Sequence, residues 1–103
     1  MNPLYLAGNE DVADAAAISL DKTASYFSTG GAETATLAAG VEGQIKTLMM
    51  FADSGDMVVT VTNCGWKASG TGTITFDTVG DACTLQYVND KWFAVGINGV
   101  TFA

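Results

Sequence analysis

Few residues in this sequence could carry out chemistry, and histidine is absent altogether. Histidine is the commonest general base near neutral pH and a frequent ligand of zinc and copper. Its absence removes the pairing of a serine nucleophile with a histidine base, together with most zinc and copper sites. The sequence therefore predicts a non-enzymatic protein with no catalytic residue, no metal ligand and no cofactor.

Two cysteines, Cys64 and Cys83, stand far apart in the sequence and form no CxxC motif. A zinc site or a thioredoxin-type redox pair requires such close spacing. Cys83 falls at an inward position of a predicted strand. We expect two buried thiols, and a disulfide between neighbouring strands is the alternative.

Two pairs of carboxylates lie close in sequence, Asp53 with Asp56 and Asp77 with Asp81. Paired carboxylates can hydrolyse glycosidic bonds, and the oxygen-rich segment 53–56 could bind calcium. Both pairs fall at predicted turns, where aspartate commonly bonds to nearby backbone. We expect turn roles for them, with a small β-barrel hydrolase and a calcium site as alternatives.

The tryptophans Trp66 and Trp92 could stack on sugar rings in a lectin-like site. Aromatic side chains on an otherwise apolar strand more often belong to a core or to an interface. The glycine-rich segments 28–40 and 69–76 lack the Gly-Lys-Ser/Thr ending of a phosphate-binding loop, so we interpret them as turns.

The charge composition of this 103-residue chain restricts the classes of partner that it could bind. Carboxylates outnumber lysines by eleven to four, there is no arginine, and the net charge is −7. Nucleic acids and anionic membrane surfaces are bound through several basic side chains, so neither is expected as a partner. The N-terminus lacks the features of a secretory signal, and no apolar run approaches the ~20 residues of a membrane span, so synthesis in a cytosol is expected.

Strand signals fill the chain from residue 18 onward. Segments rich in Thr, Val, Ile and aromatic residues are interrupted every eight to twelve residues by Gly, Asn or Asp. This predicts an all-β fold, an antiparallel β-sandwich or barrel with Greek-key or meander connections. Strands are expected at residues 18–20, 24–28, 33–37, 44–51, 57–62, 72–76, 83–88, 91–97 and 100–102.

The predicted organisation is an N-terminal arm, residues 1–17, followed by a single β domain, residues 18–103. Within the arm, residues 8–17 could form a short helix or a flexible segment, and both interpretations stay open. Asn98-Gly99 is predicted to form a type I′ hairpin turn, and Asn89-Asp90 is a weaker candidate for the same turn. The last three strands would then form a meander.

Alternation assigns the inner face to Val59, Val61, Ile74, Phe76, Cys83, Leu85 and Tyr87. The segments 44–51 and 91–97 break the alternation because both of their faces carry apolar residues. Since 49% of the residues are hydrophobic and only 15% are charged, we expect a partner subunit to cover one of these faces. Met50 and Trp92 are the residues predicted to contact it.

Residues 33–102 resemble a module found in virion proteins of tailed phages, especially those that infect cyanobacteria. Its most specific elements are the motifs EGQxKT at 42–47, TITFD at 73–77 and LQYxNxKW at 85–92. Such modules are β-rich, form symmetric and often trimeric projections from capsids or tails, and have no catalytic motif.

The resemblance implies a capsid decoration or cement protein, a homotrimer on the virion surface whose partner is the major capsid protein. Leu4, Tyr5 and Leu6 are apolar residues at a chain end and are predicted to contact the capsid. The alternative is a fibre or knob module that recognises host glycan through Trp66 and Trp92.

Overall fold

The computed structural model describes residues 8–103 and contains ten β-strands arranged in two five-stranded sheets. The described residues form no helix. The strands are β1 (Asn9–Asp11), β2 (Ala16–Ala17), β3 (Ala24–Ser28), β4 (Glu33–Leu37), β5 (Ile45–Ala52), β6 (Met57–Thr62), β7 (Thr71–Phe76), β8 (Ala82–Val88), β9 (Lys91–Asn98) and β10 (Thr101–Phe102). The predicted all-β sandwich is confirmed.

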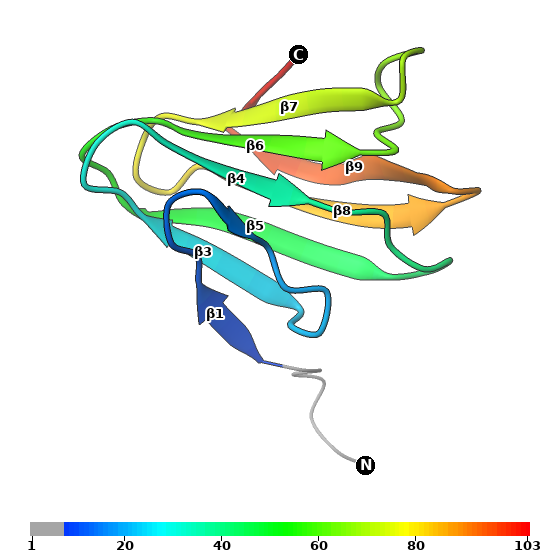
Figure 1. Ribbon diagram of the computed structural model, residues 1–103, viewed down its shortest axis with the longest axis horizontal. Helices are drawn as coiled ribbons and strands as arrows, with labels where there is room; N and C mark the ends of the chain where they lie inside the picture. Colours follow the sequence, from blue (N-terminus) through cyan, green and yellow to red (C-terminus); the bar gives the residue numbers. More distant parts are fainter. Residues whose placement is uncertain (1–7) are drawn as a thin grey trace.

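The sheets form the two layers of the sandwich. Sheet A has the strand order β1-β3-β5-β8-β9, and sheet B has the order β10-β7-β6-β4-β2. Figure 1 shows β4, β6 and β7 in one layer, and β3, β5, β8 and β9 in the other. The chain alternates between the sheets from β1 to β6, so that it winds through the two layers like the coils of a β-helix.

This winding makes half of the strand pairs parallel. Strands β1, β3 and β5 are parallel neighbours in sheet A, and β2, β4 and β6 are parallel neighbours in sheet B. The remaining pairs, β5 with β8, β8 with β9, β6 with β7 and β7 with β10, are antiparallel. The expectation of antiparallel sheets is therefore wrong for the first six strands.

Residues 9–17 belong to the sandwich, which corrects the predicted boundary of the arm at residue 17. They form β1 and β2 rather than a helix or a flexible segment, and each strand extends one sheet by pairing in parallel. Side-chain bonds hold β1 in place, because Glu10 Oε2 accepts hydrogen bonds from Ser25 Oγ at 2.7 Å and Ser19 N at 2.8 Å. The predicted strand at 18–20 is displaced to Ala16–Ala17.

The core lies between the sheets, and alternation identified much of it. All seven residues assigned to the inner face are at most 3% exposed, as are Phe27, Leu37, Leu48 and Met57. Phe27 and Phe76, one from each sheet, meet edge to face with ring centroids 5.0 Å apart. The outer face of sheet B carries mainly threonines, in rows such as Thr36, Thr60 and Thr73.

The two asparagine turns behave differently from the prediction. Asn89 and Asp90 both have positive φ, at 51° and 63°, and join β8 to β9 in a two-residue hairpin, as a type I′ turn requires. At Asn98-Gly99 only Gly99 has positive φ, at 77°. That turn leads from sheet A to sheet B, because β10 pairs with β7. The predicted C-terminal meander is thus wrong beyond β9.

Candidate interaction surface

The carboxylates that could have formed a hydrolytic pair make turn bonds. Asp81 is 6% exposed, and its Oδ2 accepts hydrogen bonds from the backbone N–H groups of Asp77 and Thr78 at 3.0 and 3.1 Å. Asp53 Oδ1 accepts one from Gly55 N at 3.0 Å. Within residues 8–103, no group of three or more His, Cys, Asp or Glu side chains is placed to hold a metal ion.

Both cysteines are free thiols buried in the core. Burial raises the pKa of the Cys83 thiol to about 12. Because the thiolate is the nucleophilic form, Cys83 is unreactive near neutral pH. The expectation of buried thiols is confirmed, and the alternative of a disulfide is wrong.

Lys46 is the one lysine buried in the described part of the chain, at 0% exposure. Its Nζ donates hydrogen bonds to the carbonyls of Ser19 and Lys22 at 2.7 and 2.8 Å and lies 3.8 Å from Glu10 Oε2. Burial lowers the pKa of Lys46, and the nearby Glu10 carboxylate partly opposes that effect. These contacts tie the segment between β2 and β3 to β5, which is a structural role.

The EGQxKT motif at 42–47 also has a structural explanation. The two carboxylate oxygens of Glu42 accept hydrogen bonds from Asn89 N at 2.8 Å and Asp90 N at 2.7 Å, which supports the β8–β9 turn. Gln44 accepts a bond from Val41 N and donates one to Leu20 O. The motif therefore links the start of β5 to the β8–β9 turn and to the segment that precedes β3.

Met50 and Trp92 do not form a surface. They are 2% and 0% exposed within this chain, so the prediction that they contact another subunit is corrected. Trp92 Nε1 donates to Ala38 O at 2.9 Å, and its ring packs edge to face against Tyr87 with centroids 4.9 Å apart. A glycan platform of Trp66 and Trp92 is likewise unavailable, because only Trp66 is partly exposed.

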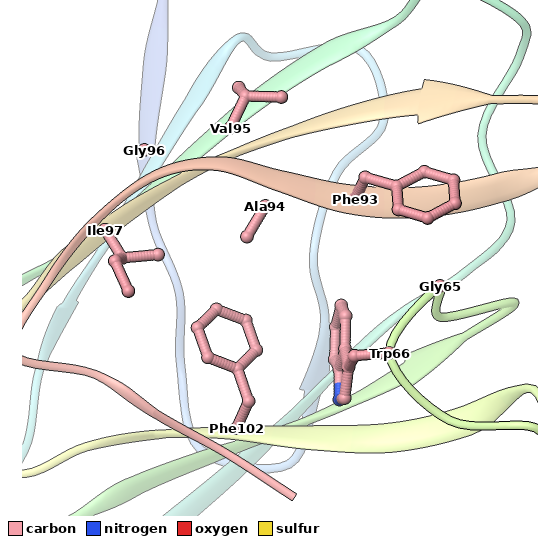
Figure 2. Close-up of a pocket in the computed structure, with 8 residues that line it drawn as sticks. All are labelled: Gly65, Trp66, Phe93, Ala94, Val95, Gly96, Ile97 and Phe102. Atoms are coloured by element: carbon pink, nitrogen blue, oxygen red, sulfur yellow. The ribbon is translucent and has the colours of Figure 1, made fainter.

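An apolar cleft of about 570 Å³ opens at the flank of the sandwich. Figure 2 shows β9 on one side of the opening, and Trp66 and Phe102 on the other. The rings of Trp66 and Phe102 meet edge to face with centroids 4.9 Å apart, and Trp66 Nε1 donates to Ala103 O at 3.2 Å. The lining residues are Gly65, Trp66, Phe93, Ala94, Val95, Gly96, Ile97 and Phe102.

Strand β9 leaves apolar side chains in solvent around this cleft. Phe93, Val95 and Ile97 are 40%, 59% and 61% exposed. A bulge in the β8–β9 ladder pairs Thr84 with Gly96 and Leu85 with Ala94, so that Val95 has no partner on β8. The apolar excess in the segment 91–97 is thus exposed at these positions rather than at Trp92.

The outer face of sheet A is apolar or uncharged over its three central strands. Outward positions of β3, β5 and β8 carry no charged side chain, because Lys46 points inward. Phe51 is 70% exposed, and its ring centroid lies 5.6 Å from that of Tyr26 beside a second cavity of about 350 Å³. The apolar residues of this face, which we call the outer apolar face, are the exposed Ile45, Phe51, Val88 and Phe93 and the half-buried Tyr26 and Met49.

Leu4, Tyr5 and Leu6, the predicted capsid contacts, lie outside the described residues. No membrane-spanning helix is found in the part of the chain that the structure describes. Sequence reasoning missed the contact of Trp66 with Phe102 on the side of the cleft opposite β9. A weak signal for it was the run of apolar residues after Lys91 that contains no further charge.

The fold assigns the chain to the class of all-β sandwiches with mixed sheets. No protein-family model matches the sequence, and no curated protein matches it either. No activity or ligand is therefore carried over from a relative, and the surfaces described above are the basis for a function.

Proposed function

We propose that the protein is a non-enzymatic structural protein of a phage virion, a decoration protein that assembles as a homo-oligomer on the capsid surface. The observation that carries the proposal is the outer apolar face of sheet A on a chain whose net charge is −7. Large exposed apolar surfaces mark sites of protein contact. The phage capsid as the location rests on the resemblance of residues 33–102 to virion modules.

The contribution of one contact can be worked out from Phe51. It is 70% exposed, so covering a side chain of roughly 200 Å² would bury about 140 Å² of apolar surface. At about 25 cal/mol per Å² this gives about 3.5 kcal/mol before the entropy of association is subtracted. A few such contacts bind weakly alone, and multivalent attachment of an oligomer to a repeating capsid would make the binding strong.

Capsid contact is proposed for the outer apolar face together with Leu4, Tyr5 and Leu6. These three residues precede β1 in the sequence, and β1 forms one edge of sheet A. The proposed partner is the major capsid protein. The acidic remainder of the chain would disfavour binding to DNA.

Co-sedimentation with undecorated phage heads tests the proposal. The wild-type protein should pellet with heads, Phe51→Asp should weaken binding by at least tenfold, and the matched control Thr60→Asp on sheet B should bind like wild type. Leu4→Ser together with Leu6→Ser should also weaken binding. Failure of the wild-type protein to pellet, or equal loss in the Thr60→Asp control, would contradict the proposal. Binding to host polysaccharide instead would favour the receptor-binding alternative.

A further inference from the structure

The edges of the two sheets differ greatly in length. Three of the four edge strands, β1, β2 and β10, have two or three residues, whereas β9 has eight. Short edge strands protect a sheet from pairing with another chain, and a long apolar edge invites it. Strand β9 contains no proline, and its one charged residue, Lys91, stands at its start.

Only the beginning of the β9 edge is covered. Trp92 accepts a hydrogen bond from Gly65 N and donates one to Asn63 O, both at 2.8 Å, next to an isolated bridge between Cys64 and Trp92. Beyond this point no described strand pairs with the outer edge of β9, which is the last strand of sheet A. Backbone N–H and C=O groups there are free to pair with another strand.

We propose that the free edge of β9 binds the same edge of a second copy of this chain, antiparallel and about a two-fold axis. Sheet A would then continue into sheet A of the partner. The inference deepens the proposed function, because it rests on the homo-oligomer and names the surface that forms it. It also changes the copy number, since a contact of one surface with itself joins two copies rather than three.

Charge favours a second copy as the occupant. Two copies of a chain with net charge −7 repel each other over most orientations. The last carboxylate side chain in the sequence is that of Asp90, so residues 91–103 contain Lys91 and no acidic side chain. A two-fold contact through β9 places this acid-free segment against the same segment of the second copy. A basic peptide would find no carboxylate side chain among the residues that line the cleft.

The cleft gives the partner strand a place for its side chains. Neighbouring strands lie about 4.8 Å apart, so a strand added to β9 would lie across the mouth of the cleft. In Figure 2 the side chains of Ala94, Ile97, Phe102 and Trp66 surround this opening. Inward side chains of the added strand would then contact Trp66 and Phe102, and the 61% exposed Ile97 would be covered.

The contact involves one strand and one cleft, so it is smaller than a standard interface of about 800 Å² per partner. We therefore expect a dissociation constant on the order of 10 µM rather than a permanent dimer. At 200 µM the protein should be mainly dimeric.

Light scattering during size-exclusion chromatography tests the inference on the full chain. At 200 µM the wild-type protein should have twice the 10.6 kDa mass of one chain. The single variants Val95→Lys and Ile97→Lys should each reduce the association constant at least tenfold, because each would place a charge in the apolar contact. Thr60→Lys, which makes the same charge change on the exposed face of sheet B, should remain dimeric. Circular dichroism confirms that each variant is folded.

A cysteine variant tests the contact without adding charge. Val95→Cys should form an interchain disulfide on mild oxidation, because Val95 lies near the middle of the free edge and would lie beside the two-fold axis, whereas Thr60→Cys should not. Residue 97 is unsuitable for this test because it pairs with the free thiol Cys83 on β8. A dimer that survives both lysine substitutions and fails to cross-link would overturn the β9 contact while leaving a homo-oligomer in place. A wild-type mass of three chains would overturn the two-fold arrangement. A monomer at 200 µM would overturn both the inference and the homo-oligomer.

Discussion

Replacing Lys46 by methionine removes a buried ammonium group while keeping a long apolar side chain. Lys46 Nζ donates to the carbonyls of Ser19 and Lys22, which connects the β2–β3 segment to β5. Each hydrogen bond to a charged group contributes about 1.5–3 kcal/mol, so two give roughly 3–6 kcal/mol. The desolvation that lowers the pKa of Lys46 offsets part of this amount. We expect Lys46→Met to lower the free energy of unfolding by about 2 kcal/mol.

Urea unfolding at pH 7, followed by tryptophan fluorescence, measures this change. Lys67→Met is the matched control, because Lys67 is exposed, and it should change stability by less than about 0.5 kcal/mol. Hydrogen exchange should also quicken at Ser19, whose N–H donates to Glu10 Oε2 beside Lys46.

The pH dependence of the same variant follows from the lowered pKa of Lys46. Between its pKa in the folded protein and its higher pKa in the unfolded chain, the unfolded state binds more protons, so this group makes stability rise with pH. The variant should lack that rise. Equal stability of wild type and Lys46→Met at pH 7, or the same loss in Lys67→Met, would refute the reasoning about this buried lysine.

Three further predictions test the fold. Burial raises the pKa of Cys83 to about 12, so above pH 9 the folded state binds more protons than the unfolded state and stability should fall as pH rises. In urea unfolding between pH 8 and pH 10, the wild type should lose about 1.4 kcal/mol more stability than Cys83→Ala. Asp90→Gly should raise the urea midpoint, by about 0.5–1 kcal/mol in stability, since φ is 63° there; a lower midpoint would contradict the turn assignment. Gly72→Ala should lower the melting temperature, because the added Cβ would lie 2.7 Å from Trp66 Nε1 and 2.9 Å from Cys64 Sγ. The control Gly96→Ala should leave the melting temperature unchanged, because no atom lies within 4 Å of a Cβ added there. Equal effects of the two substitutions would be evidence against this packing.

Alternation and turn residues predicted the strands well where one face is buried. The expected segments 24–28, 33–37 and 57–62 coincide with β3, β4 and β6. Threonines that alternate with apolar residues identify the last two of these strands, and the aromatic residues of ASYFS identify the first. The same pattern does not say which strand is the neighbour. The parallel pairing of β3 with β5 and of β4 with β6 was therefore missed.

The surface was harder to predict than the strands. Both faces of β9 look apolar in the sequence, and this pattern places Trp92 among the apolar residues that a monomer would expose. Its position depends on contacts distant in sequence, with Ala38 O and the ring of Tyr87, and the bulge at Val95 then changes which side chains face outward. Strand β1 was missed because its sequence, NED, has low strand propensity and is held by Ser25 and Lys46.

The most direct test of the account is sedimentation velocity of the wild-type protein from 1 to 200 µM, at about 20 mM and about 500 mM NaCl. The account predicts a reversible dimer whose association strengthens at high salt, because salt screens the repulsion between chains of net charge −7 and leaves an uncharged contact intact. A monomer at every concentration, or association that weakens as salt is added, would contradict it.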